Sequence, residues 1–137
     1  MSSYAFPPGG HPDKNTSPVG TAVFTQAYAV IPAATQRDIV TSFLPGWAGT
    51  RAWILARPLS GFAETFAQYA IELAPEGGSN DPEPNRDAQA ILFVAKGTSH
   101  LTFGDSLHVM SPGSDAYIPA GAQWTLFNRN DEPCGIH

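Results

Sequence analysis

The sequence has few of the features that mark secreted or membrane-spanning proteins. It contains one cysteine, Cys134, so no disulfide can form within the chain, and a single thiol fits a reducing compartment. No apolar run approaches the 20 residues of a transmembrane helix. The first ten residues have neither a basic start nor an apolar stretch, so no secretory signal is visible. We therefore expect a cytoplasmic protein.

Positive charge is also scarce. Lys and Arg number 7 against 12 Asp and Glu, which gives a formal net charge of −5 at pH 7. Non-specific binding to nucleic acid needs a basic patch, and no run of like charges is long enough to form an interaction tail. We therefore expect neither nucleic acid nor a membrane as a partner. The composition predicts a β-rich domain that binds or acts on a small molecule or another protein.

Turn-forming residues are abundant, with 13 Gly and 13 Pro among 137 residues. Residues 1–20 are rich in both and predict an extended N-terminal arm. From residue 21 onward, short apolar runs alternate with turns about ten residues apart, the pattern of an all-β sandwich or barrel. Strands are predicted near 21–24, 27–31, 38–44, 51–57, 64–73, 89–96, 98–103, 106–110, 115–118 and 122–128. The segment 74–87 is too rich in Pro and Gly to pair in a sheet and predicts a loop.

Alternation of side chains along the later strands predicts which residues face the core. The inward set is Ala90, Leu92, Val94, Trp124, Leu126 and Asn128, and the outward set is Ile91, Phe93, Ala95, Gln123, Thr125 and Phe127. Strands that are apolar on both faces are usually covered on both sides. Ile91, Phe93 and Phe127 therefore predict an interface with a second domain or a second copy of the chain, with the N-terminal arm as the alternative cover.

Residues 113–128 match the second signature of the cupin superfamily, G-x5-P-x-G-x2-H-x3-N. Gly113, Pro119, Gly121 and Asn128 are in register, and Trp124 stands where the signature has a metal-binding histidine. The match predicts a cupin fold, a double-stranded β-helix or jelly-roll barrel, over residues 21–137.

The first cupin signature, G-x5-H-x-H-x3,4-E-x6-G, lacks its ligands here. With Gly97 as the last glycine, Ala90 takes the carboxylate position, and Glu83 and Asn85 take the two histidine positions within one residue. Zinc, manganese and iron need three or four converging lone pairs. Ala90 offers none, and an indole offers only an N–H donor. We expect no metal in this barrel.

Trp124 has two interpretations. It fills the space of the missing metal site as part of the core, which we favour, or it forms a platform in a retained pocket with Gln89 or Tyr69. No catalytic residue is assigned. The histidines are predicted to be surface residues, and no G-x-S-x-G motif of a hydrolase occurs. Cys134 has no positioned base nearby. His100 and His108, on either side of the Gly104 turn, are expected as surface cross-strand neighbours.

Three stretches resemble one family: Asp38 to Trp47, Thr50 to Pro58 and Phe66 to Ser79 are similar to the N-terminal half of (S)-ureidoglycine aminohydrolases. These bicupins of allantoin degradation were formerly labelled glyoxylate-induced proteins. The resemblance implies two barrels, with manganese and the hydrolytic release of ammonia in a C-terminal barrel that this chain lacks. It also implies that the present half is a metal-free structural barrel, inactive alone. The alternative is a stand-alone metal-free cupin that binds a small ligand or another protein.

Overall fold

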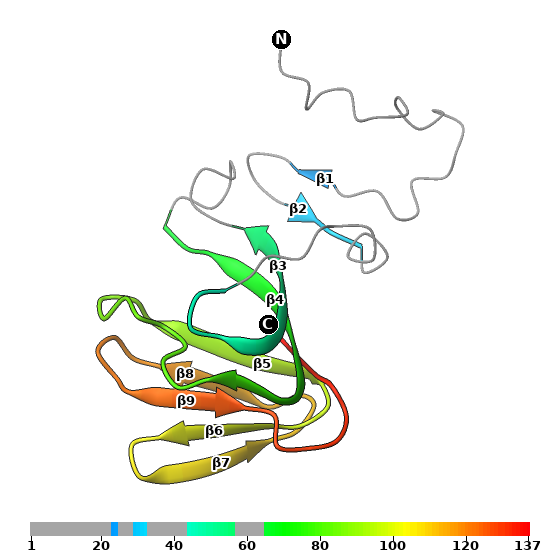
Figure 1. Cartoon of the computed structure of the whole chain (residues 1–137). Coiled ribbons are helices and arrows are strands. Elements are labelled where there is room, and N and C mark those ends of the chain that lie inside the picture. Colours follow the sequence, from blue (N-terminus) through cyan, green and yellow to red (C-terminus); the bar gives the residue numbers. More distant parts are fainter. Residues whose placement is uncertain (1–22, 25–28, 33–43, 57–64) are drawn as a thin grey trace.

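The computed structural model describes residues 23–24, 29–32, 44–56 and 65–137, and the structural statements below concern these residues (Figure 1). Every regular element within them is a β-strand, which confirms the all-β prediction. No helix in these ranges is long and apolar enough to cross a membrane. The ten strands are β1 (Val23–Phe24), β2 (Ala29–Val30), β3 (Ala48–Ala56), β4 (Gln68–Ser79), β5 (Ala90–Lys96), β6 (Ser99–Phe103), β7 (Ser106–Met110), β8 (Asp115–Ile118), β9 (Trp124–Phe127) and β10 (Cys134–Ile136).

The predicted strands agree well with the structure from residue 90 onward, except that β10 was not predicted. The predicted strand 38–44 and the predicted arm 1–20 lie almost wholly or wholly outside the described residues. β10 is only three residues long and follows a Pro- and Asn-containing turn, so it carries too little periodicity to be recognised.

Strands β3 to β10 form one antiparallel sheet that curls into a nearly closed barrel. The hydrogen-bonded order is β7-β6-β9-β4-β10-β5-β8, with β3 paired to the other side of β4, while β1 and β2 form a separate pair. Figure 1 shows β6, β7 and β9 side by side as one layer. The two ends of the order, β7 and β8, do not pair with each other, so the barrel is open between them.

Strand β4 joins the two layers because it is long and sharply irregular. On one side, residues 71–73 pair with β10 whereas Gly78 and Ser79 pair with β9, and β3 pairs along the other side as far as Gly78. The prediction of a loop from residue 74 was therefore wrong for 74–79. Glycine there permits a close approach between backbones: a Cβ at Gly78 (φ +155°) would collide with the carbonyl oxygen of Leu126. The Gly77-Gly78 pair, which predicts the end of a strand, therefore lies where β4 crosses from one layer of the barrel to the other.

The core fills the barrel between the layers and follows the predicted alternation. The buried apolar residues that form one cluster are Trp47, Leu73, Leu92, Val94, Leu101, Met110, Ile118, Trp124, Leu126, Cys134 and Ile136. Ile91, Phe93 and Ala95 point outward on β5, as predicted. The inward and outward residues of β9 are also as predicted, with Leu126 fully buried.

A buried side-chain amide connects three parts of the barrel. Asn128 is fully buried, and its Nδ2 donates to the carbonyl oxygens of Leu73 on β4 (3.1 Å) and Glu132 (2.7 Å). Its Oδ1 accepts from the backbone N–H of Asn130 (3.0 Å). Its backbone also bonds to β4, through Gly77 O and the Glu76 N–H, both at 2.8 Å. The turn between β9 and β10 is therefore folded around this one amide.

The outward apolar residues do not form the single face that the sequence predicted. Ile91 (73% exposed) and Phe93 lie on β5, and Ile91 is paired with Tyr117 of β8 (60% exposed). Phe127 lies on β9 in the other layer, where the Arg129 guanidinium covers its ring at 4.4 Å. Two layers of one barrel point their outer faces in different directions, so Phe127 is not part of the Ile91 and Phe93 surface.

Replacing Asn128 should destabilise the barrel more than replacing its neighbour. Asn128→Ala removes the donor from the buried carbonyl oxygen of Leu73 and from the partly buried carbonyl oxygen of Glu132, and we expect a loss of about 3 kcal/mol in the free energy of unfolding. Asn130→Ala removes one exposed bond, from Nδ2 to Thr98 O, and should cost less than about 1 kcal/mol. Urea unfolding of both variants measures the difference, and equal losses would contradict the role assigned to Asn128.

Candidate functional site

The four positions that correspond to cupin metal ligands do come together. Glu83, Asn85, Ala90 and Trp124 line one cavity at the end of the barrel where β5 and β9 begin, and the turn around Gly121 closes it. The cavity measures about 10 Å³. That volume is at the lower limit for a single water molecule.

The loop before β5 is held over this cavity by hydrogen bonds to its own neighbours. Ser79 Oγ donates to Gly46 O (2.7 Å) and accepts from the Asp81 N–H (3.1 Å). The indole N–H of Trp47, itself in the core, donates to Pro82 O (3.3 Å). These bonds fix where the loop enters the site.

One side-chain oxygen of Glu83 and the side-chain oxygen of Asn85 accept hydrogen bonds within this loop. Glu83 Oε1 accepts from the Asn85 N–H at 2.8 Å, and Asn85 Oδ1 accepts from the Asp87 N–H at 3.0 Å. The Asn85 carbonyl accepts from the Ala88 N–H at 3.1 Å. Both would-be ligand side chains therefore stabilise successive turns of the loop.

The residues at this site do not fit a metal ion. Ala90 has no donor atom, Trp124 has only an N–H, and the other two side chains already accept backbone hydrogen bonds. Elsewhere in the described part of the chain, no three His, Cys, Asp or Glu side chains lie close enough to hold one. A transition metal needs three or four converging donors, and this donor set supplies too few.

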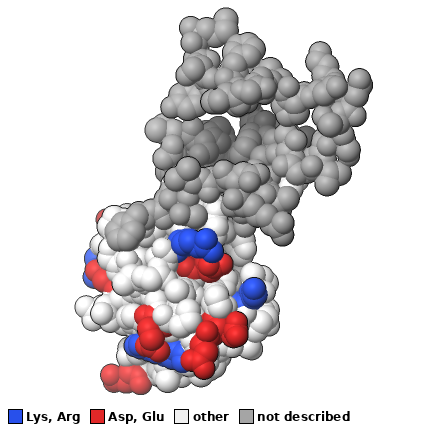
Figure 2. Space-filling view, turned by 45° about the vertical axis from the view of Figure 1, so that its right-hand side comes forward, with Lys and Arg blue, Asp and Glu red and all other residues white. Residues whose placement is uncertain are grey.

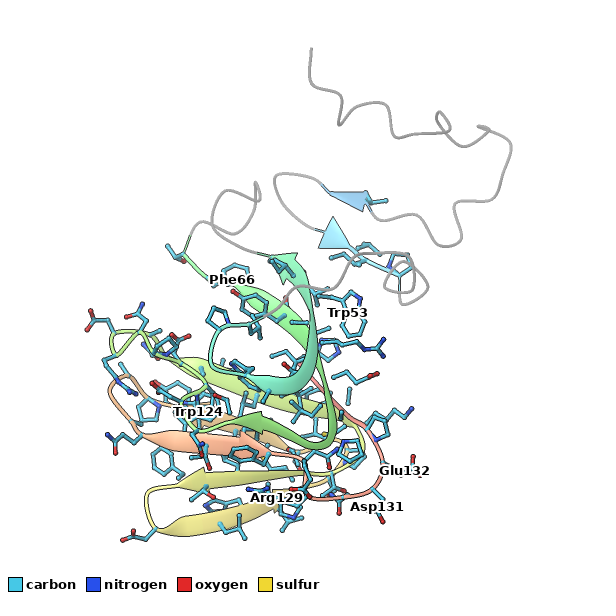
Figure 3. The ribbon with its side chains drawn as sticks, viewed as in Figure 1. Trp53, Phe66, Trp124, Arg129, Asp131 and Glu132 are labelled. Carbon is cyan, nitrogen blue, oxygen red and sulfur yellow. The ribbon has the colours of Figure 1, made fainter. Side chains whose placement is uncertain are left out.

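Trp124 belongs to the core. It is 7% exposed, packs in the main apolar cluster and is paired across the strands with Phe103 (Figure 3). A cavity of about 10 Å³ beside it leaves no room for an organic ligand to stack on the ring.

The two expected companions of Trp124 lie elsewhere. Gln89 is exposed beside Ala90, and its Oε1 accepts from the hydroxyl of Tyr117 at 2.6 Å. Tyr69 lies on β4 opposite Ile54 of β3. Neither residue lines the cavity. The alternative interpretation, a pocket of Trp124 with Gln89 or Tyr69, therefore has no support in this cavity. Gln89 precedes β5 and is exposed, and Tyr69 lies at the start of β4, far along the strand from Gly78 and Ser79, which pair with β9.

A second, larger hollow lies where the barrel is open. A groove of about 310 Å³ runs between β6 and β7 on one side and β8 on the other. Leu101, Met110 and Ile118 are buried in its lining, and His108 is its exposed imidazole. Sequence reasoning missed this groove because it lies between β7 and β8, the two ends of the sheet, which do not pair with each other.

The two hairpin histidines lie on opposite faces of their layer, so they are not the cross-strand neighbours that the sequence predicted. His108 is paired with the inward residue Leu101, whereas His100 is paired with Val109 and with Phe127 on the outer face. The hairpin register therefore separates them.

Several charged side chains of the described residues form local pairs, while Glu83 and Arg86 line the small cavity and Asp115 lines the groove. On the face shown in Figure 2, Lys and Arg lie next to Asp and Glu, separated by large uncharged areas. The ion pairs are Arg51–Glu72, Arg86–Asp81 at 3.0 Å and Arg129–Glu76 at 2.8 Å. Figure 3 shows Arg129, Asp131 and Glu132 at the turn before β10. Exposed pairs of this kind contribute little to stability.

The buried thiol of Cys134 is protected from ionisation. The residue is fully buried on β10, and burial raises the pKa of its thiol, while the Ser99 hydroxyl acts more weakly in the opposite direction. A protonated, inaccessible thiol is a poor nucleophile. Cys134 is therefore a core residue.

Comparison with known proteins agrees with this architecture. Residues 70–136 match the model of the cupin domain family. These residues form a cupin domain. The fold of the described chain is accordingly the all-β jelly-roll barrel predicted from the 113–128 signature. No curated protein matches the chain.

Three solved structures illustrate the likeness. A Pseudomonas aeruginosa protein named as glyoxylate-induced is 50% identical, with a TM-score of 0.76, over 99% of this chain and 49% of that one. Protein Ylba from Escherichia coli is 24% identical, with a TM-score of 0.74, over 85% of this chain and 46% of its own. A sugar phosphate isomerase of the cupin superfamily from Silicibacter pomeroyi is 24% identical, with a TM-score of 0.58, over 71% and 65%. The chain thus spans about half the length of the first two.

Removing the Trp124 ring should test whether it acts as core. Trp124→Ala deletes a buried aromatic side chain, and we expect the free energy of unfolding to fall by about 3–5 kcal/mol. Tyr117→Ala removes a largely exposed ring and should change it by about 0.5 kcal/mol. Thermal and urea unfolding of the two variants give the comparison, and a Trp124→Ala protein as stable as Tyr117→Ala would refute a core role.

The raised thiol pKa predicts a specific loss of stability in alkali. The unfolded chain ionises Cys134 above the ordinary thiol pKa of about 8.5, whereas the folded chain still holds the proton. The unfolded state then binds fewer protons, so stability falls as the pH rises. We expect the stability gap between wild type and Cys134→Ala to narrow between pH 8 and 10, as measured by urea unfolding. A constant gap would contradict the raised pKa.

Proposed function

We propose that this chain is the metal-free cupin half of a two-cupin protein of the (S)-ureidoglycine aminohydrolase type, and that it acts as a scaffold. The main support is that Ala90 and Trp124 occupy the ligand positions around a cavity too small for a metal and a substrate. The 50% identity to one half of a protein named as glyoxylate-induced supports the choice of family.

In this proposal, the chemistry of the whole protein belongs to another barrel. Hydrolysis of ureidoglycine to ureidoglycolate and ammonia needs a group that polarises the reacting carbon, a role that a manganese ion can fill. The present barrel has no converging donors for such an ion, so manganese and the catalytic residues are assigned to the second cupin. A cytoplasmic location remains a prediction.

The outer face of β5 and β8 is the proposed contact with the second cupin domain or with a second copy. Ile91, Phe93 and Tyr117 make it apolar, and the only charge paired across these strands is Asp115, opposite Phe93. Burying such aromatic and aliphatic groups is favourable at about 25 cal/mol per Å². Phe127, expected in the same interface, lies on the other layer and is left out of this contact.

Metal content and ammonia release test the proposal together. After incubation of the 137-residue chain with excess manganese and desalting, we expect far less than one ion per chain, and no ammonia from ureidoglycine above the uncatalysed rate. The matched control is the double variant Ala90→Glu and Trp124→His, which restores two ligand types and should retain more manganese than the wild type. One tightly held ion or ammonia release by the wild-type chain would overturn the proposal.

The groove between β7 and β8 favours a second candidate, a stand-alone cupin that binds a small ligand. Its volume of about 310 Å³ lies at the lower end of the range for small-molecule sites, and its floor is apolar with one imidazole. In the same preparations, saturable binding of a small organic compound that is lost in Ala116→Trp, which fills the groove, would favour this candidate over a scaffold.

A further inference from the structure

Strand β7 is an exposed sheet edge without the usual protection. Among the described strands it pairs with β6 alone, in an unbroken register of five residue pairs from Ser106 to Met110. Leu107 and Val109 on its outer face are 62% and 63% exposed. The strand contains no Asp, Glu, Lys, Arg or Pro. A regular apolar edge of this kind readily pairs with another strand.

In the eight-stranded sheet, the other two strands that pair on one side only, β8 and β3, are different. β8 has only four residues and carries Asp115, and β3 carries the exposed Arg51. Short length and charged side chains are common devices that keep sheet edges from pairing. Of these three edge strands in the described barrel, β7 alone has neither a short length nor a charged side chain. The β7 edge is therefore the one that remains open to pairing with another strand.

We propose that β7 pairs antiparallel with β7 of a second copy of the chain, with His108 at the centre of the two-fold axis. This register places Leu107 opposite Val109 of the second copy, twice, on the outer face. It places Asp105 opposite the uncharged Ser111, so no like charges meet across the edge. The strand is thus complementary to itself in the one register that a two-fold axis requires.

Two physical gains favour this pairing. The unpaired backbone groups of β7 exchange water for hydrogen bonds to the second copy, each with a modest net contribution. The Leu107 and Val109 pairs bury cross-strand apolar surface, which adds about 0.2–1 kcal/mol per pair. A five-residue edge gives a small interface, so the dimer is reversible and depends on protein concentration.

The pairing also affects the open groove. His108 lines the groove on the β7 side, and Asp115 lines it from β8. In the dimer, the two His108 side chains lie next to each other on the paired β7 strands, each beside the groove of its own copy. The proposal does not depend on metal binding or on the ureidoglycine reaction, so its failure leaves the proposed function untouched.

A single cysteine at the centre of β7 gives a direct test. Residue 108 of one copy would lie about 4.5–5.5 Å, Cα to Cα, from residue 108 of the other, which is within reach of a disulfide. We expect His108→Cys to form a covalent dimer under mild oxidation. Leu107→Cys is the matched control on the same strand: it faces Val109 of the second copy and should cross-link far less. Wild type, with Cys134 buried, should not cross-link.

A charge at the edge tests the same proposal without cross-linking. Sedimentation should show a wild-type dimer that dissociates on dilution, a dissociation constant raised at least tenfold by Leu107→Lys, and little change with Gln123→Lys, an exposed control outside both proposed contacts. Ile91→Lys tests the separate contact proposed for the outer face of β5 and β8. Circular dichroism verifies folding of the three variants. A monomer at every concentration, equal cross-linking of residues 107 and 108, or a dimer lost through Ile91→Lys and retained in Leu107→Lys would overturn the proposal.

Discussion

The buried amide of Asn128 is the interaction on which the barrel closure depends. It lies at the end of β9, accepts and donates within the turn that leads to β10, and donates to the middle of β4. β4 in turn is the strand that crosses between the layers, at the point where Gly78 meets the backbone of β9. Without a donor at residue 128, the crossing strand and the last strand lose their common anchor.

The scaffold and the chemistry of a cupin site are carried by different residues, which is why one can persist without the other. Gly121 adopts φ +78° in the turn before β9, and Asn128 satisfies buried carbonyl groups after it. Neither role involves a metal. The ligand positions, by contrast, need donor atoms only for chemistry. Alanine at 90 and tryptophan at 124 are compatible with the barrel, where Trp124 is part of the apolar core and Ala90 packs against it.

The two outer faces and the open edge divide the surface of the barrel into distinct regions. The β5 and β8 face is apolar and aromatic, whereas the β9 face is partly covered by Arg129 above Phe127. The β7 edge presents backbone groups as well as apolar side chains. In the proposed scaffold role, the apolar surfaces would contact other barrels, whereas the exposed ion pairs lie apart from them.

The sequence by itself determined the fold class, the strands after residue 90, the alternation around Leu92 and Leu126 and the cupin signature, because these rest on local periodicity and turn chemistry. It also determined that the ligand positions hold the wrong donors. Only the tertiary structure decided that Gly77 and Gly78 lie in a strand and that Gln89 and Tyr69 do not line the cavity beside Trp124. It also decided that Phe127 lies on a different face from β5, and that a groove lies between β7 and β8. Each of these depends on which strands become neighbours, and neighbours distant in the chain leave no periodic trace in the sequence.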